Sequence, residues 1–364
     1  MWYDKAKIEH LNTTGRRIIA VSDIHANLPY FKGLIKKIKL SPYDVLILNG
    51  DFLEKGEDSL ATLRFIMELG REYDVHPICG NCDSWADLTE EQTYFPLDRI
   101  LKYILFRGSG ILYDMLCEMG VELKEGLDLA PYMPELKDRF REEWDFLRKL
   151  PQIIETPHYT FVHGGVKPDL PYEEQMAGDC MKFDNFMEQG YIFDKWVIVG
   201  HWPVMLYLPD HVCANPIINE KQHIISIDGG CTLKDDGQLN ALIIPYEGSE
   251  DFSFVSYDKF PVKTVVTPQK KGEKSYYIRW GDNKVKVLSR GGEFSLCRHI
   301  RTGYEMEILT KYLYSEEEET TCNDSTDLVL ELNPGDEVSV IETTSRGFLV
   351  KHKGTSGWYF GELR

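Results

Sequence analysis

The sequence has no apolar run long enough to cross a membrane, and its first residues form no apolar signal segment. Basic residues are in deficit, because 41 Lys and Arg stand against 59 Asp and Glu, which gives a formal net charge of −18. This balance disfavours binding to a nucleic-acid backbone or to an anionic membrane. An anionic substrate would need a local source of positive charge, and bound metal ions would supply it. We expect a cytoplasmic protein.

Cysteine is present without the pattern of a disulfide framework. The eight cysteines are scattered over 364 residues, which suits a reducing compartment. Cys79 and Cys82 form a C-x-x-C pair, but no helix signal follows them, so a thioredoxin-like role is disfavoured. The 43 % apolar fraction supports a full core, and the length allows two or three domains.

Side chains that can bind metals follow several short apolar runs. Asp23 and His25 come directly after the predicted strand 17–22. In an extended backbone, residues i and i+2 point to the same side, so both side chains could reach one point. Further predicted strands, at 44–48, 75–79, 159–162, 196–199 and 223–227, also end in polar groups, among them Asp51, Asn81, His163, His201 and Asp228.

Amphipathic helices are predicted between the early strands, over 28–38 and 59–69. Strands that alternate with helices are typical of a largely parallel sheet, in which sites form beyond the carboxyl ends of the strands. Residues 241–245 and 252–257 alternate like antiparallel strands. Residues 86–150 are predicted to be a helical insertion that packs on the sheet and walls a cleft, with helical spacing at 103–119 and 135–150.

Five short motifs occur in order along the first part of the chain. They are Asp23-x-His25, Gly50-Asp51-x-x-Glu54, Gly80-Asn81-x-Asp83, His163-Gly164-Gly165 and Gly200-His201. Together they resemble the calcineurin-like metallophosphoesterases, and most closely the serine/threonine-phosphatase-like branch. The resemblance covers roughly residues 16–260. It implies an α/β fold, a four-layer β-sandwich flanked by helices.

The resemblance also implies a centre with two metal ions. One ion would take Asp23, His25 and Asp51, and the second would share Asp51 and take Asn81, His163 and His201. Oxygen and imidazole ligands suit manganese, iron or zinc, and we favour manganese. A hydroxide bridging the ions would attack phosphorus in line. Taken singly, His163 or His201 would more simply be a core imidazole, but the pair after Val- and Ile-rich strands favours ligands.

The sequence departs from the family pattern beside these ligands. Cys82 stands where relatives carry the histidine that protonates the leaving group, and Glu54 stands where they carry its partner Asp. A thiol lacks the positive charge of imidazolium and should help a poor leaving group less; alternatively, Cys82 is only a small buried filler. Lys55 replaces an arginine that grips phosphate bidentately. With Asn81 and Lys182, it is expected to bind phosphate.

The character of the chain changes beyond residue 260. We expect a catalytic domain over 1–260, a linker over 261–274 and a β-rich region over 275–364. A cut within the linker should spare the catalytic domain. Residues 305–364 resemble bacterial Src-homology-3-like barrels, which would contact a peptide or a partner chain.

These patterns predict a metal-dependent phosphoester hydrolase acting on a phosphorylated protein or small molecule. The resemblance favours a serine/threonine-phosphatase-like phosphomonoesterase. Phosphodiesterases and dinucleoside tetraphosphatases stay open, because the ligand set does not separate them. A protein that recognises phosphate without turnover is the alternative outside the enzymes.

Overall fold

The computed structural model describes residues 3–88 and 96–364. The chain divides into two compact units. The first unit comprises 1–203, 216–233 and 238–258, and the second comprises 204–215, 234–237 and 259–364. Among the described residues, no helix is both long and apolar enough to span a lipid bilayer.

The first unit is built on two sheets. One sheet has the order β12-β11-β2-β3-β4, with β2 (Ile18–Val21), β3 (Val45–Leu48), β4 (Asp74–Pro77), β11 (Leu239–Ile244) and β12 (Ser253–Tyr257). The other has the order β1-β5-β6-β7-β10-β9, with β1 (Ile8–His10), β5 (Ile153–Glu155), β6 (Tyr159–Val162), β7 (Trp196–Val199), β9 (Ile217–Asn219) and β10 (Ile224–Ser226). The strands β2, β3 and β4 are parallel, whereas β11 and β12 are antiparallel, as the sequence predicted.

Alternation along β2 explains how the first sheet packs on both faces. Ile18 and Ala20 belong to an apolar cluster shared with residues of the second sheet such as Phe161. Ile19 and Val21 point to the opposite face and join the cluster that contains the helices. Both faces of β2 are therefore buried, which is why this strand reads as a continuous apolar run. The predicted α/β fold, a β-sandwich flanked by helices, is confirmed.

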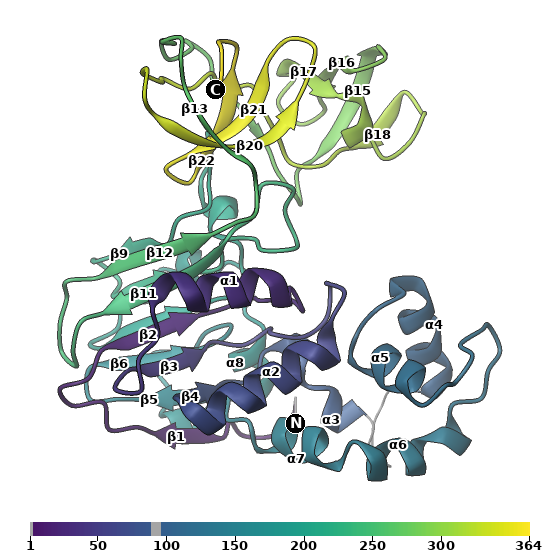
Figure 1. The fold of residues 1–364 in the computed structure, drawn as a ribbon, viewed down its shortest axis with the longest axis vertical. Helices are drawn as coiled ribbons and strands as arrows, with labels where there is room; N and C mark the ends of the chain where they lie inside the picture. The colour runs from purple at the N-terminus through teal and green to yellow at the C-terminus, as the bar shows by residue number, and fades with distance from the viewer. Residues whose placement is uncertain (1–2, 89–95) are drawn as a thin grey trace. The chain divides into compact units, whose positions relative to one another are not determined.

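Two helices cover the outer face of the five-stranded sheet (Figure 1). Helix α1 (Leu28–Ile38) is capped at its N-terminus by Asn27, whose side chain accepts a hydrogen bond from the N–H of Tyr30. This contact satisfies one of the free N–H groups at the start of the helix. Helix α2 (Ser59–Glu72) buries Leu63 and Ile66 against the same core. Each helix begins shortly after a strand ends, so the connecting loops lie at the carboxyl edge of the sheet.

The helical insertion is present but more broken than predicted. Its helices are α3 (Trp85–Leu88), α4 (Leu97–Arg107), α5 (Ile111–Glu118), α6 (Met133–Arg139) and α7 (Arg141–Lys149). The helix predicted over 103–119 is interrupted because Gly108 and Gly110 both have positive φ. The helix predicted over 135–150 is divided at Phe140, which leaves the helical conformation. The part of the insertion at 89–95 lies outside the described residues.

The second unit is β-rich, as predicted. One sheet has the order β13-β20-β21-β22-β8, with β8 (Val212–Cys213), β13 (Val262–Thr264), β20 (Glu337–Thr343), β21 (Phe348–His352) and β22 (Thr355–Tyr359). Another has the order β17-β16-β15-β18, with β15 (Lys284–Ser289), β16 (Phe294–His299), β17 (Glu305–Leu309) and β18 (Glu319–Thr321). A short pair joins β14 (Tyr277–Ile278) to β19 (Ser325–Thr326).

The segment 261–274 is not the sparsely paired linker that the sequence suggested. It contains β13, which pairs with β20, and the N–H groups of Gln269 and Gly272 donate to backbone carbonyls near β22. Its Pro and Lys content was a poor guide, because the pairing partners lie far along the chain. The domain boundaries themselves stay a prediction.

Two short loops belong with the second unit although they precede residue 260. Ser356 on β22 pairs with Val212 on β8, and Met205, Val212 and Tyr277 share a small apolar cluster. In the other loop, Nζ of Lys234 donates a hydrogen bond to Oδ2 of Asp324 (2.6 Å). The polypeptide therefore passes from one unit to the other five times.

This connectivity predicts the outcome of a truncation. A chain ending at Asp258 should lose stability relative to the full chain, because 204–215 and 234–237 lose their strand, core and ion-pair partners. Thermal unfolding and binding of a dye to exposed apolar surface would measure this. An unchanged unfolding temperature, with no added dye binding, would show that the first unit folds alone.

Candidate metal centre

The predicted ligands follow strands, but their backbone is not extended. Asp23, His25, Asp51 and His201 have φ values of 56°, 49°, 51° and 64°. We predicted that Asp23 and His25 converge because of the two-residue period of a strand. This reason is therefore wrong. The strand β2 ends at Val21, and the side chains turn inward through left-handed residues. Such conformations cost free energy in residues other than glycine and are concentrated at functional sites.

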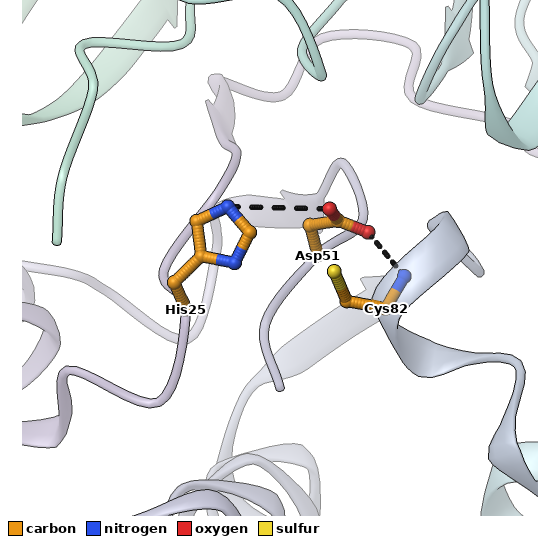
Figure 2. A group of neighbouring side chains, drawn as sticks. All are labelled: His25, Asp51 and Cys82. Atoms are coloured by element: carbon orange, nitrogen blue, oxygen red, sulfur yellow. Dashed lines mark hydrogen bonds and ion pairs between the residues drawn. The ribbon is translucent and has the colours of Figure 1, made fainter. Parts of the chain in front are cut away.

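Two groups of possible ligand atoms meet at Asp51. One group contains His25, Asp51 and Cys82, and the other contains Asp51, His163 and His201, with the atoms of each group within 4.8 Å of one another. Figure 2 shows the first group, with the imidazole of His25 on one side of the Asp51 carboxylate, the backbone nitrogen of Cys82 on the other, and the sulfur between them. Asp23 lies beside this group, its Oδ1 3.6 Å from Nε2 of His25.

The carboxylate of Asp51 is oriented to serve both groups. Its Oδ2 lies 4.0 Å from Nε2 of His25, and its Oδ1 lies 3.2 Å from Nε2 of His163. Oδ1 also accepts a hydrogen bond from the backbone N–H of Cys82 (2.8 Å). One carboxylate oxygen thus faces each histidine, which is the arrangement that a carboxylate shared by two cations requires.

Hydrogen bonds fix the ring orientation of both histidines in the second group. Nδ1 of His163 donates to the carbonyl of Asn49 (2.9 Å), which leaves Nε2 facing Asp51. Nε2 of His201 donates to Asp184 (2.8 Å), which leaves Nδ1 facing Asn81. Histidines that bind metals are usually held in this way, with one nitrogen donating to an oxygen and the other turned to the ion.

Electrostatics support cations at this place. The carboxylates of Asp23, Asp51, Asp83 and Asp228 are buried within the same region. Burial and the charge of Asp228 raise the pKa of Asp23 well above its ordinary value. Burial opposes a charge on His163, but the neighbouring carboxylate of Asp51 raises the pKa of this imidazole. Buried carboxylates in excess are normally paired or bound to metal, so this donor set fits metal ions.

The glycines of the motifs make room for the ligands. A methyl group on Gly80 would collide with the carboxylate and the backbone nitrogen of Asp51, and one on Gly200 would collide with Ser22 and Asp23. Any larger residue at either position would displace a carboxylate from the site. The spacing of Gly and ligand in the sequence motifs has this steric origin.

The carboxylate of Glu54 is engaged by residues other than Cys82, the acid that it was expected to orient. Oε1 of Glu54 accepts from the N–H of Ile111 (2.8 Å) and Oε2 accepts from the hydroxyl of Tyr103 (3.1 Å). Both donors belong to the insertion, and within the described residues no hydrogen bond joins Glu54 to Cys82. Glu54 therefore holds the loop after β3 to α4 and α5. Burial raises its pKa to about 7.

The expected phosphate-binding residues lie in different surroundings. Lys55 is near the first donor group, since burial lowers the pKa of His25 to about 4 and the charge of Lys55 acts in the same direction. The Asn81 amide lies 2.9 Å from Nδ1 of His201 and 3.3 Å from the carbonyl of Met181. Lys182 follows α8 (Ala177–Met181) and its side chain is exposed. Asn81 thus contacts a histidine of the centre, and the charge of Lys55 acts on His25, whereas no contact of the Lys182 side chain places it there.

Comparison with known proteins adds independent support for a phosphoesterase. The sequence signature described as calcineurin-like phosphoesterase matches residues 16–220. The chain belongs to this family. Membership of this family indicates a phosphoesterase, and the two donor groups at Asp51 could hold metal ions.

Several known proteins are similar to part of this chain. The symmetrical bis(5'-nucleosyl)-tetraphosphatase of Haemophilus ducreyi is 30% identical over 154 residues, which cover 41% of this chain and 45% of the relative. The protein of the same name from Actinobacillus succinogenes is 26% identical over 152 residues, covering 41% and 44%. The chain thus spans less than half the length of these curated relatives. The cold-active protein-tyrosine phosphatase of a psychrophilic Shewanella aligns with a TM-score of 0.44 and 13% identity, covering 69% of this chain and 82% of that one.

Two supporting residues of this calcineurin-like site were missed from the sequence. Asp184 precedes His201 by seventeen positions and follows no strand, so nothing in the pattern marked it. Asp83 was part of a motif, but its role was not assigned. It accepts hydrogen bonds from the backbone N–H groups of Gly80, Asp51, Phe52 and Leu53. Asp83 thereby sets the conformation of the loop that presents Asp51.

A substitution at Gly80 tests the steric argument. Gly80→Ala should abolish most metal binding, because the added methyl group displaces Asp51. Gly70→Ala is the matched control: Gly70 is exposed in α2, and an added methyl group would come no closer than 4.0 Å to Val75. The control should keep its metal and gain about 0.5–1 kcal/mol of stability. Metal analysis and chemical denaturation would measure both, and normal metal content in Gly80→Ala would contradict the argument.

The raised pKa of Glu54 predicts a pH dependence of stability in metal-free protein. Its pKa is about 7 in the folded state and about 4.3 in an unfolded chain. Folding therefore takes up a proton between these values, and the contribution of Glu54 to stability is lost as pH rises from about 4.3 through 7, by up to about 4 kcal/mol.

Glu54→Gln keeps an acceptor for the N–H of Ile111, and its amide N–H can donate to the hydroxyl oxygen of Tyr103. It should flatten this dependence, whereas substitution of the exposed Glu57 by Gln should not. Urea denaturation at about pH 5 and about pH 8 would show the difference. An unchanged pH slope in Glu54→Gln would show that the carboxyl group is not buried as an acid.

Proposed function

We propose that this phosphoesterase uses two metal ions that share Asp51. The observation that carries the proposal is the orientation of this carboxylate, with one oxygen toward His25 and the other toward His163. Manganese, iron and zinc are the candidate ions for oxygen and imidazole donors. Bound ions would stabilise charge on the phosphoryl oxygens and activate water for attack in line.

The residues of the chain supply the remaining requirements of such a reaction. Asp23 and His25 would hold the first ion, and Asn81, His163 and His201 would hold the second. Lys55 adds positive charge beside His25, where a phosphoryl oxygen would bind. Together these groups give a strongly acidic chain the local positive charge that an anionic substrate needs.

Within the phosphoesterases, we infer that the substrates have leaving groups that depart without being protonated. Burial raises the pKa of the Cys82 thiol well above its ordinary value, so this thiol is a weak proton donor. A phosphate group that leaves from a phosphoanhydride needs little protonation, in contrast to a serine alkoxide. The name that the two curated relatives share, symmetrical bis(5'-nucleosyl)-tetraphosphatase, fits this class of substrate. Dinucleoside polyphosphates are therefore the substrates we propose first.

A serine/threonine-phosphatase-like phosphomonoesterase is the second candidate. The motif His163-Gly164-Gly165 and the single histidine in Gly200-His201-Trp202 favour it, since this pattern resembles that branch. For the second unit, we propose that the strands of 305–364 form an Src-homology-3-like surface that contacts a peptide or another chain.

A substrate panel with matched variants tests the proposal. The full chain with added metal should hydrolyse a dinucleoside tetraphosphate faster than a phosphoserine peptide. Asp51→Asn should lose at least one metal ion and slow turnover by about a thousandfold or more, because one oxygen of the shared carboxylate becomes an amide. Asp58→Asn, in an exposed position before α2, is the control and should behave like the unaltered chain.

Metal analysis and phosphate release would be measured on the same samples. Full metal content and full turnover in Asp51→Asn would refute the shared carboxylate. Metal binding without hydrolysis of any phosphoester in the panel would favour a recognition protein instead. Faster hydrolysis of the phosphoserine peptide would select the second candidate.

A further inference from the structure

The first donor group differs from the one that the sequence motifs implied. The motifs assign Asp23, His25 and Asp51 to one ion, whereas the structure gathers His25, Asp51 and Cys82 within 4.8 Å of one another. The sulfur atom points toward the space between Asp51 and His25 (Figure 2). Cys82 is 8% exposed, and His25 and Asp51 are 2% and 3% exposed. The thiol is therefore buried with two established kinds of metal-binding group.

We propose that Cys82 is itself a metal ligand and that the ion bound with His25 and Asp51 is thiophilic, such as zinc. This inference rests on the proposed function, because it concerns the same metal centre, and it changes the role of Cys82 from a proton donor to a donor of a metal–sulfur bond. The thiol proton passes to solvent as the bond between Sγ and the ion forms.

The backbone that carries the sulfur is held in place by hydrogen bonds on both sides of Cys82. Residues Asn81–Asp83 form a single tight helical turn, and the N–H of Cys82 donates to Oδ1 of Asp51 at 2.8 Å. Asp83, the next residue, is held by four backbone N–H groups of the neighbouring loops. The backbone of Cys82 is thus held from both sides, and its thiol lies next to the carboxylate that both donor groups share.

A second observation indicates a cation on this side of Asp51. Oδ1 of Asp23 is buried and makes no hydrogen bond within the described residues, although it lies 3.6 Å from Nε2 of His25. A buried carboxylate oxygen without a donor is costly. An ion held by His25, Asp51 and Cys82 would lie beside this oxygen and could take it as a fourth ligand.

The dimensions and chemistry of the group favour zinc over manganese. Bonds of about 2.0–2.1 Å to nitrogen or oxygen and about 2.3 Å to sulfur place the ligands of a tetrahedral zinc roughly 3.3–3.8 Å apart. Donor atoms that lie within 4.8 Å of one another would therefore draw together by up to about 1–1.5 Å when the ion binds. One sulfur, one imidazole and one or two carboxylates are donors that zinc accepts in proteins. Thiolate ligands disfavour manganese, which prefers oxygen.

The test compares Cys82→Ser with Cys79→Ser in the full chain, with Cys82→Ala as a second variant in case serine perturbs folding. Cys79 is the matched control, because it is buried three residues away and its thiol contacts the carbonyl of Gly80. Metal-free protein would be titrated with cobalt, which gives a sulfur-to-metal charge-transfer band when a thiolate binds. Circular dichroism would confirm that each variant is folded.

The expected result is a charge-transfer band in the unaltered chain and in Cys79→Ser that is lost in both Cys82 variants. Equilibrium dialysis should show zinc binding weakened by about tenfold or more in the Cys82 variants, with a much smaller change for manganese. A band that survives in folded Cys82→Ser, or equal losses of zinc and manganese affinity, would overturn the assignment.

The same samples separate this inference from the proposed function. If the chain binds metal and hydrolyses phosphoesters but its cobalt spectrum does not depend on Cys82, only the role of Cys82 fails. If the unaltered chain binds neither cobalt nor zinc nor manganese, both fail together.

Discussion

The metal centre depends on one side chain that is not itself a candidate ligand. The carboxylate of Asp83 accepts four backbone hydrogen bonds, from Gly80 and from three consecutive residues beginning at Asp51. These bonds hold the loop after β3 in a conformation with a positive φ at Asp51 and place its carboxylate between two histidines. Because hydrogen bonds from backbone N–H groups to a buried carboxylate are strong, they can offset the strain of that backbone.

The polar residues around Asp51 meet the same constraint, because they too orient charged groups that are buried away from water. Asn49 joins the two sheets. Its side-chain amide donates to the backbone carbonyls of Val162 and Ile198, and its backbone carbonyl accepts from Nδ1 of His163. The second histidine depends on Asp184, an exposed residue outside the sheets. The rigid interior thus orients one histidine and a surface loop orients the other. Substitutions near Asp184 should therefore alter metal affinity while the protein stays folded. Substitutions near Asn49 should less readily alter it without unfolding the protein.

Much of this arrangement could be predicted because strand ends and glycines leave clear marks in a sequence. The strands β6 and β7 were predicted at their observed bounds, and Asp51, His163 and His201 do come together. The strand β1 was missed, because a three-residue strand at the sheet edge carries too little periodicity. The pairing of β13 and the capture of 204–215 by the second unit depend on partners more than fifty residues away, and a local pattern cannot reveal them.

The replacement of an imidazole by the Cys82 thiol shows where sequence comparison and structure differ most. By motif position, the residue replaces a proton donor, and the question is how well a thiol performs that task. In three dimensions the supposed partner, Glu54, accepts hydrogen bonds from Tyr103 and Ile111 of the insertion, and among the described residues it makes none with Cys82. A thiol without an orienting partner and beside the carboxylate of Asp51 fits the metal ligand that we propose better than it fits an acid. The contacts of Glu54 with the helical insertion therefore bear on the chemistry available at Cys82.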